Sequence, residues 1–136
     1  MKNLVKNLIK VSGITLTVIT PLLAFSQQTF AKYGQYSSFQ NSCSNLSIAG
    51  DTLSATCRTR NGSYNNTSIR IRGIANNNGN LIYTGRNRTS SYPSSCRNIT
   101  IYMDRLAANC RTRNGGFNQT AIRVPGIKNY NGYLRY

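Results

Sequence analysis

The chain has 136 residues and a formal net charge of +15, with 17 lysines and arginines against two acidic residues. It contains no histidine, and its two acidic residues are Asp51 and Asp104. General acid–base catalysis most often uses histidine or a pair of carboxylates, so this inventory leaves almost no catalytic groups. We therefore expect a binding protein and not an enzyme, and we expect both aspartates to occupy turns.

The first 31 residues have the pattern of a secretory signal peptide. A segment with three lysines precedes a mostly apolar stretch at residues 11–25, and small residues follow at Ser26 and Ala31. We predict cleavage after Ala31, with cleavage after Ser26 as the alternative. About 20 apolar residues are usually needed to span a bilayer, and polar residues dilute this stretch, so a membrane anchor is disfavoured. The mature chain would be secreted or periplasmic, without a transmembrane segment.

Residues 43–83 and 96–136 are two copies of one motif, related by a constant offset of 53 positions without a gap. Of the 41 aligned positions, 23 are identical, and the run Cys-Arg-Thr-Arg-Asn-Gly occurs at 57–62 and again at 110–115. Self-similarity at a fixed period indicates one supersecondary unit built twice. Two similar units favour two similar binding sites.

This duplication sets the predicted domain organisation. Residues 1–31 are the signal peptide and residues 32–136 form one small domain. Within it we place the first repeat at about 36–83, a linker at 84–89 and the second repeat at about 90–136. We expect a monomer, with a dimer formed by domain swapping through the linker as the alternative.

Four cysteines in an exported chain of this size predict disulfides. The equal spacing of 14 residues favours the local pairs Cys43–Cys57 and Cys96–Cys110, although the sequence alone leaves all three pairings open. A zinc site is disfavoured because the chain has no histidine and no Cys-x-x-Cys spacing. We expect no metal and no other cofactor.

Apolar residues alternate with a period of two, which indicates half-buried strands and not helices. Asn-Gly dipeptides, which suit tight hairpin turns, separate the strands. The sequence therefore predicts an all-β fold of small antiparallel sheets and hairpins with pseudo-twofold symmetry, linked by disulfides. The alternating residues are Leu53, Ala55, Cys57, Ile69 and Ile71, then Leu106, Ala108, Cys110, Ile122 and Val124, and the dipeptides begin at Asn61, Asn78, Asn114 and Asn131.

Further features match a known family. An aromatic residue precedes the first cysteine of each repeat by four positions (Phe39 and Tyr92), and each repeat closes with Asn-x-Asn-Gly-x-Leu-x-Tyr. In these features and in the cysteine spacing, the chain resembles the cyanovirin-N homologue family from about Tyr33 to Tyr136. The resemblance implies that each disulfide stays within its repeat and that the lobes exchange segments, so that each lobe mixes both repeats. It also implies a lectin for the terminal mannose of high-mannose glycans.

The resemblance implies one carbohydrate site at each end of the fold. Both predicted clusters combine amides, hydroxyls and guanidinium groups, which can form paired hydrogen bonds with sugar hydroxyls. The alternative is that these runs are only polar hairpin tips. Site 1 would comprise Asn41, Ser42, Arg58, Thr59, Arg60, Asn129, Asn131 and Gly132. Site 2 would comprise Asn76, Asn78, Gly79, Ser94, Ser95, Arg111, Thr112 and Arg113, with Ser90 and Ser91 as further candidates.

Charge supplies a rival hypothesis. Removing the three lysines of the signal peptide leaves 17 − 3 = 14 basic residues against two acids, a net charge of +12. Twelve of these basic residues are arginines, which form forked contacts with phosphate, sulfate or carboxylate. The alternative function is therefore a binder of anionic polymers: acidic or sulfated glycans, lipopolysaccharide or nucleic acid. We expect Arg70 and Arg123, on outer strand faces, to carry that binding.

Overall fold

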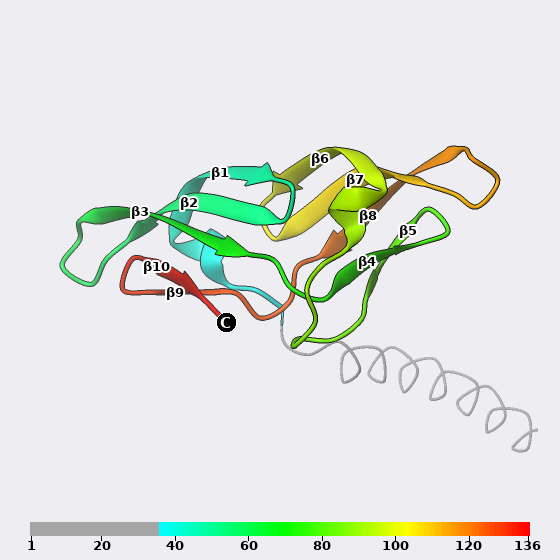
Figure 1. Cartoon of the computed structure of the whole chain (residues 1–136). Coiled ribbons are helices and arrows are strands. Elements are labelled where there is room, and N and C mark those ends of the chain that lie inside the picture. Colours follow the sequence, from blue (N-terminus) through cyan, green and yellow to red (C-terminus); the bar gives the residue numbers. More distant parts are fainter. Residues whose placement is uncertain (1–35) are drawn as a thin grey trace, which may run out of the picture. The chain divides into compact units, whose positions relative to one another are not determined.

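The computed structural model describes residues 36–136, so the predicted signal peptide lies outside the described part of the chain. The described residues belong to the compact unit Gln35–Tyr136. They form ten strands and two short 3-10 helices, in the order η1 (Phe39–Asn41), β1 (Cys43–Ala49), β2 (Thr52–Arg58), β3 (Tyr64–Arg70), β4 (Ile74–Asn77), β5 (Asn80–Tyr83), η2 (Tyr92–Ser94), β6 (Cys96–Tyr102), β7 (Arg105–Arg111), β8 (Phe117–Arg123), β9 (Lys128–Tyr130) and β10 (Tyr133–Arg135) (Figure 1).

Each repeat contributes one three-stranded antiparallel sheet and one two-stranded hairpin. The sheets are β1-β2-β3 and β6-β7-β8, and the hairpins are β4-β5 and β9-β10. Equivalent residues occupy equivalent registers, since Leu53 pairs with Ile69 in one sheet and Leu106 with Ile122 in the other. The all-β class and the pseudo-symmetric two-repeat architecture are confirmed.

The disulfides follow the local pairing. Cys43 is bonded to Cys57 and Cys96 to Cys110, and each pair joins residues that lie opposite one another on neighbouring strands. A crosslink that closes a loop of this length is worth about 3 kcal/mol in the chain-entropy model. Each disulfide therefore stabilises the sheet of its own repeat.

The hairpins are exchanged between the repeats. The hairpin β9-β10 of the second repeat packs against β3 of the first, and β4-β5 of the first repeat packs against β8 of the second (Figure 1). At each junction a threonine hydroxyl accepts a backbone N–H: Thr67 from Leu134 at 3.2 Å and Thr120 from Leu81 at 3.1 Å. Each lobe therefore mixes both repeats, as the family resemblance implied.

Two buried serines hold the segments β3–β4 and β8–β9, by which the chain passes from one lobe to the other. The hydroxyl of Ser90 donates to the carbonyl of Ile71 at 2.7 Å and accepts from the amide of Ile74 at 3.0 Å. Ser37, the equivalent residue of the first repeat, does the same with Val124 at 2.6 Å and Ile127 at 2.9 Å. Ser90 is thus a buried structural residue, and its prediction as a sugar-contacting residue in site 2 is wrong.

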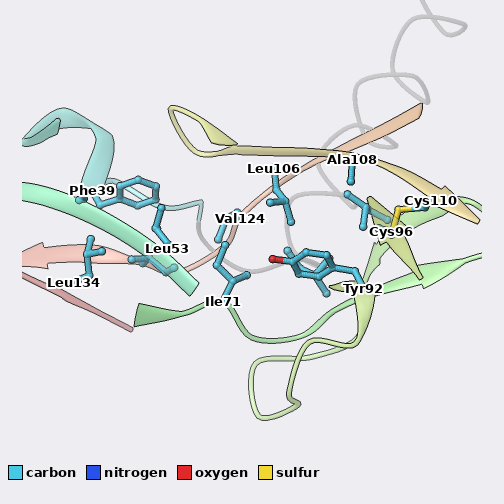
Figure 2. Packing of buried hydrophobic residues seen from close by; sticks show 14 of the residues in the cluster. Phe39, Leu53, Ile71, Tyr92, Cys96, Leu106, Ala108, Cys110, Val124 and Leu134 are labelled. Atoms are coloured by element: carbon cyan, nitrogen blue, oxygen red, sulfur yellow. A yellow bond between two sulfur atoms is a disulfide. The ribbon is translucent and has the colours of Figure 1, made fainter. Parts of the chain in front are cut away.

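One hydrophobic cluster runs through both repeats (Figure 2). The residues that alternate with period two supply its inward faces, and Phe39 and Tyr92 are fully buried within it. The hydroxyl of Tyr92 reaches the carbonyl of Gly50, in the other repeat, at 2.8 Å. Since burial of one large apolar side chain contributes about 1.5–3 kcal/mol, the shared cluster makes the folding of either repeat depend on the other.

Asp51 and Asp104 lie in the turns β1–β2 and β6–β7, as predicted, and each also forms an ion pair that the sequence did not reveal. Asp51 accepts from Arg70 at 2.9 Å and Asp104 accepts from Arg123 at 2.8 Å. Arg70 and Arg123, which we expected to carry binding of an anionic polymer, are exposed as predicted, but each is paired with a carboxylate. Each of these guanidinium groups is paired with one of the chain's two carboxylates.

The segment between the repeats folds back on the first repeat. The amide of Gly73 donates to the carbonyl of Arg88, and the amide of Thr84 donates to the carbonyl of Gly73, both at 2.7 Å. Arg72 and Thr89 form an antiparallel bridge beside these bonds. Gly73 has a φ of +73°, and a Cβ there would lie 2.2 Å from the carbonyl oxygen of Gly85, so the segment can approach this closely only because residue 73 is glycine.

Candidate functional site

The predicted site 1 residues do come together, although they belong to different repeats. The side-chain amide of Asn129 donates to the hydroxyl of Ser42 at 2.9 Å and to the carbonyl of Arg58 at 2.8 Å. Its oxygen accepts the amide of Gly132 at 2.8 Å, which closes the β9-β10 turn. Asn129 therefore ties the hairpin of the second repeat to the end of β2 in the first.

The predicted site 2 residues repeat this arrangement with the repeats interchanged. The side-chain amide of Asn76 donates to the hydroxyl of Ser95 at 3.0 Å and to the carbonyl of Arg111 at 2.9 Å. Its oxygen accepts the amide of Gly79 at 2.8 Å. The two clusters thus share one hydrogen-bond pattern.

A second asparagine of each hairpin holds the neighbouring loop. The side-chain oxygen of Asn131 accepts the amide of Arg60 at 3.0 Å, and that of Asn78 accepts the amide of Arg113 at 2.9 Å. Both asparagines have a positive φ, 50° and 49°, which suits the first position of a type I′ turn. These asparagines position the Arg-Thr-Arg loops, and each side-chain oxygen uses one of its two lone pairs to accept a backbone N–H.

Each of these loops is also braced from within. In residues 59–63, the amide of Thr59 donates to the carbonyl of Ser63 at 2.8 Å and its hydroxyl donates to the side-chain oxygen of Asn61 at 2.5 Å. In residues 112–116, Thr112 makes the same two bonds to Gly116 and Asn114. The threonines predicted as sugar contacts therefore serve first to shape the loops.

In each cluster, the two-stranded hairpin contacts the Arg-Thr-Arg loop at a glycine. A Cβ on Gly132 would lie 2.7 Å from Cγ2 of Thr59, and a Cβ on Gly79 would lie 2.7 Å from Cγ2 of Thr112. Asn65 and Asn118 complete the junctions by donating to the carbonyls of these glycines, at 2.8 Å and 2.9 Å. Asn65 and Asn118 were not among the predicted site residues, although asparagine stands at the same position in both copies.

The groups left to meet a ligand are mainly donors. The side chains of Arg58, Arg60, Arg111 and Arg113 are exposed, and none of them forms an ion pair among the residues that the structure describes. Ser42 and Ser95 accept from the bridging asparagines, so each keeps its own O–H as a donor. Each cluster therefore offers two guanidinium groups and a hydroxyl on a braced backbone.

The other predicted residues lie at the edges of the clusters. Asn41 ends η1 and is exposed. Ser94 is exposed and its hydroxyl donates to the carbonyl of Ser91 at 2.8 Å, whereas the amide of Ser91 donates to the carbonyl of Ile74 at 3.0 Å. Tyr130 is 58% exposed and its ring lies 5.3 Å from the guanidinium carbon of Arg60, so an aromatic surface adjoins site 1.

Within residues 36–136, no group of three or more histidine, cysteine or acidic side chains is arranged to hold a metal ion. Among the same residues, no helix is long and apolar enough to cross a membrane.

The described part of the chain is a duplicated all-β domain with two hairpin-and-loop clusters of the same design. The family model for the CVNH domain matches residues 39–135. The chain belongs to the CVNH family.

Solved structures share this fold at low sequence identity. TbCVNH from T. borchii is 27% identical with a TM-score of 0.61, and the match covers 73% of this chain and 98% of that one. Microvirin, solved as a complex with mannobiose, is 25% identical with a TM-score of 0.57 over 72% of this chain and 96% of that one. A MoCVNH3 variant, solved with (N-GlcNAc)4, is 19% identical with a TM-score of 0.63, and the match covers 76% of this chain and 99% of that one. At 19% identity, the likeness to the MoCVNH3 variant concerns the fold alone.

Proposed function

We propose that the mature chain is an exported lectin that binds glycans at two pseudo-equivalent sites, with a mannose-type glycan as the ligand, and that it works without catalysis or a cofactor. The observation that carries this proposal is the repeated hydrogen-bond pattern: Asn129 with Ser42 and Arg58, and Asn76 with Ser95 and Arg111. Membership of the CVNH family supports it, as does the similarity to microvirin, whose solved structure contains mannobiose.

The braced loops explain how such a site would bind. Fixing a flexible loop costs conformational entropy at the moment of binding, and here the loop is already held by Asn131 or Asn78 from the facing hairpin. Hydroxyl oxygens of a sugar would accept from the serine O–H and from the guanidinium groups. Vicinal hydroxyls suit the two parallel N–H groups of an arginine fork.

The test is a titration of the folded protein with mannobiose, followed by amide NMR shifts. We expect shifts in two separate groups, residues 58–63 and residues 111–116. Arg60→Ala and Arg113→Ala are matched variants, because alanine keeps the backbone N–H that Asn131 or Asn78 accepts. Each variant should weaken binding about tenfold at its own loop only, as expected for loss of a charge-assisted hydrogen bond. If saturating mannobiose shifts neither loop, the mannose-type assignment is wrong.

The second candidate function is binding of an anionic polymer, and a different surface favours it. Arg72, Arg86 and Arg88 are all exposed. The bond between Gly73 and Arg88 and the bridge between Arg72 and Thr89 hold the backbones of Arg72 and Arg88 together, and Arg86 lies in the turn that the bond from Arg88 to Gly85 closes. We call these three residues the linker arginines. Neither of the chain's aspartates is bonded to them, since both are paired with Arg70 and Arg123.

Salt separates the two candidates. Binding of a neutral disaccharide releases few counterions and should change little between 50 and 200 mM salt, whereas a polymer that contacts several charges should lose about a thousandfold in affinity. Replacing the linker arginines with alanine should abolish only the salt-dependent binding. Heparin is a suitable anionic probe.

Export and assembly are part of the proposal and are tested separately. The intact mass of the exported product should correspond to cleavage after Ala31 or after Ser26. We propose a monomer, because the segment between the repeats folds back on Gly73 of its own chain. Size-exclusion chromatography with light scattering at micromolar concentration should give one chain mass, and twice that mass would indicate the swapped dimer.

A further inference from the structure

Site 2 adjoins a second feature that the predicted site did not include. A shallow pocket beside it is lined by Ser94, Ser95, Cys96, Arg97, Arg111 and Phe117. Ser95 follows η2, and the other lining residues come from η2, β6, β7 and the start of β8, so regular elements and the disulfide of Cys96 hold the pocket in place. Ser95 and Arg111 belong to both the pocket and the site.

Two guanidinium groups gather on one aromatic ring in this pocket. The guanidinium carbon of Arg97 lies 3.7 Å from the ring centroid of Phe117, and that of Arg111 lies 5.9 Å from the same centroid. Stacking on a ring restricts the guanidinium groups and orients them, which lowers the entropy lost when they bind. We call these three residues the Arg97–Phe117–Arg111 cluster.

The cluster has no carboxylate of its own. The chain has only two acidic residues, and both are bonded elsewhere, Asp51 to Arg70 and Asp104 to Arg123. Two like charges near one ring repel each other, and an anion between them would relieve this repulsion. Guanidinium groups and the O–H of Ser95 are donors, so the pocket complements a group that only accepts hydrogen bonds, such as a carboxylate or a sulfate.

The first repeat lacks this cluster. At the offset of 53, the residues that match Arg97, Arg111 and Phe117 are Ser44, Arg58 and Tyr64. Tyr64 is 66% exposed, and in the described part of the chain no guanidinium stacks on its ring. Site 1 therefore has the same hydrogen-bond pattern as site 2, but it has one fewer arginine beside it.

We propose that the Arg97–Phe117–Arg111 cluster makes site 2 selective for glycans that carry a carboxylate or a sulfate next to the bound sugar, whereas site 1 takes the neutral glycan. This inference rests on the proposed lectin function. It assigns different ligands to two sites that share one hydrogen-bond pattern, so that one protein would bind a neutral glycan at site 1 and an acidic glycan at site 2.

The test exchanges the distinguishing residue between the repeats. Arg97→Ser gives site 2 the serine of site 1, and Ser44→Arg gives site 1 the arginine of site 2. Both side chains are exposed on equivalent strands, so both variants should fold, and amide NMR spectra check this. The probes are mannobiose, the same disaccharide with one sulfate, and one ending in glucuronic acid. Amide shifts of residues 58–63 and 111–116 report binding at site 1 and at site 2.

In the unmodified protein we expect site 2 to prefer at least one charged probe over mannobiose by about tenfold, the size expected for one charge-assisted pair, and site 1 to show no such preference. Arg97→Ser should remove the preference at site 2, and Ser44→Arg should create one at site 1. The sulfate and glucuronate arms decide which acid the pocket takes. The preference should shrink as salt rises.

Three outcomes would overturn the inference in distinguishable ways. If mannobiose binds but site 2 treats charged and neutral probes alike, selectivity by the cluster is refuted and the lectin proposal stands. If charged probes shift only the amides around the linker arginines, the acidic ligand belongs to that surface. If no probe binds either loop, the proposed function fails and the inference fails with it.

Discussion

Asn129, in the second repeat, donates a hydrogen bond from its side-chain amide to the hydroxyl of Ser42, in the first repeat, across 2.9 Å. The same amide group also donates to the carbonyl of Arg58 at 2.8 Å. One side chain thus connects the β9-β10 hairpin with both segments that flank site 1. Asn129, which the sequence suggested as a sugar contact, holds this junction together, so we expect variants at this position to change stability as well as binding.

Asn129→Ala should lower the free energy of unfolding by about 1–3 kcal/mol, because the carbonyl of Arg58 and the amide of Gly132 lose their partner in a partly buried junction. It should also weaken glycan binding at site 1 and leave site 2 unchanged. Urea unfolding and NMR titration measure the two effects. Asn76→Ala is the matched control, with the sites interchanged. Equal weakening at both sites in either variant would contradict the description of two separate junctions.

Gly132→Ala should be more destabilising than Gly62→Ala. Both glycines have a φ of +87°, so both substitutions pay the same backbone strain of about 1 kcal/mol. Only at residue 132 does the added Cβ meet neighbours, 2.7 Å from Thr59 and 3.0 Å from Asn65, whereas nothing lies within 4 Å at residue 62. Overpacking of this kind adds about 1–3 kcal/mol, which urea unfolding of the two variants resolves. Equal losses would mean that hairpin and loop are not in contact.

The two ion pairs should differ in their response to salt. Arg70 is 70% exposed in its pair with Asp51, whereas Arg123 is 40% exposed in its pair with Asp104 and its guanidinium carbon lies 3.6 Å from the ring centroid of Tyr36. Double-mutant cycles with Asp→Asn and Arg→Met should give coupling free energies of about 0.5–2 kcal/mol for each pair. Raising NaCl from 0.05 to 0.5 M should weaken the more exposed pair by the larger fraction. A larger salt effect on the Asp104 pair would contradict this assignment.

Tyr92 should make the protein lose stability at alkaline pH. Burial of the phenol, and then the nearby Asp51 carboxylate, raise the pKa of Tyr92 above its ordinary value of 10.0. Since the pKa is raised in the folded state, the unfolded chain loses this proton first as pH rises. The contribution of Tyr92 is therefore fully present below about pH 10 and declines above it, by up to about 1.4 kcal/mol per pH unit.

The measurement is the free energy of unfolding in urea between pH 8 and 11.5 for the unmodified protein and for Tyr92→Phe. Phenylalanine keeps the ring but removes the hydroxyl that donates to Gly50, so the comparison uses the slopes and not the absolute values. The slope above pH 10 should be smaller in the variant. Some slope should remain, because burial also raises the pKa of Tyr136. Identical slopes would show that Tyr92 does not carry the alkaline loss.

The parts of this fold that depend on local pattern could be predicted from the sequence. The period of two in Leu53, Ala55 and Cys57 identified a half-buried strand, since alternate side chains of a strand face opposite sides. Asn78-Gly79 and Asn131-Gly132 identified two-residue turns, since both positions need a positive φ. The offset of 53 positions between the copies implied that every element would occur twice.

Which groups remain available to a ligand depends on contacts between segments that are far apart in the sequence. The sequence marks Asn129 and Asn131 as polar residues near a turn, but it cannot show that the side-chain amide of Asn129 donates to the carbonyl of Arg58, or that the oxygen of Asn131 accepts the amide of Arg60. Those bonds exist because the hairpin of one repeat docks on the loop of the other, more than 70 residues away in the chain. Hydrogen bonds between segments so distant depend on packing, and no local pattern encodes them.

The same reason accounts for the charges. Asp51 and Arg70 are 19 residues apart, and their pairing follows from the register of β2 and β3, which aligns Thr52 with Arg70. The ring of Phe117 meets Arg97 and Arg111 because three strands place them side by side. Composition revealed a large excess of arginine over acid. The folded arrangement of the strands places Arg70 and Arg123, and not the other arginines of the described residues, next to a carboxylate.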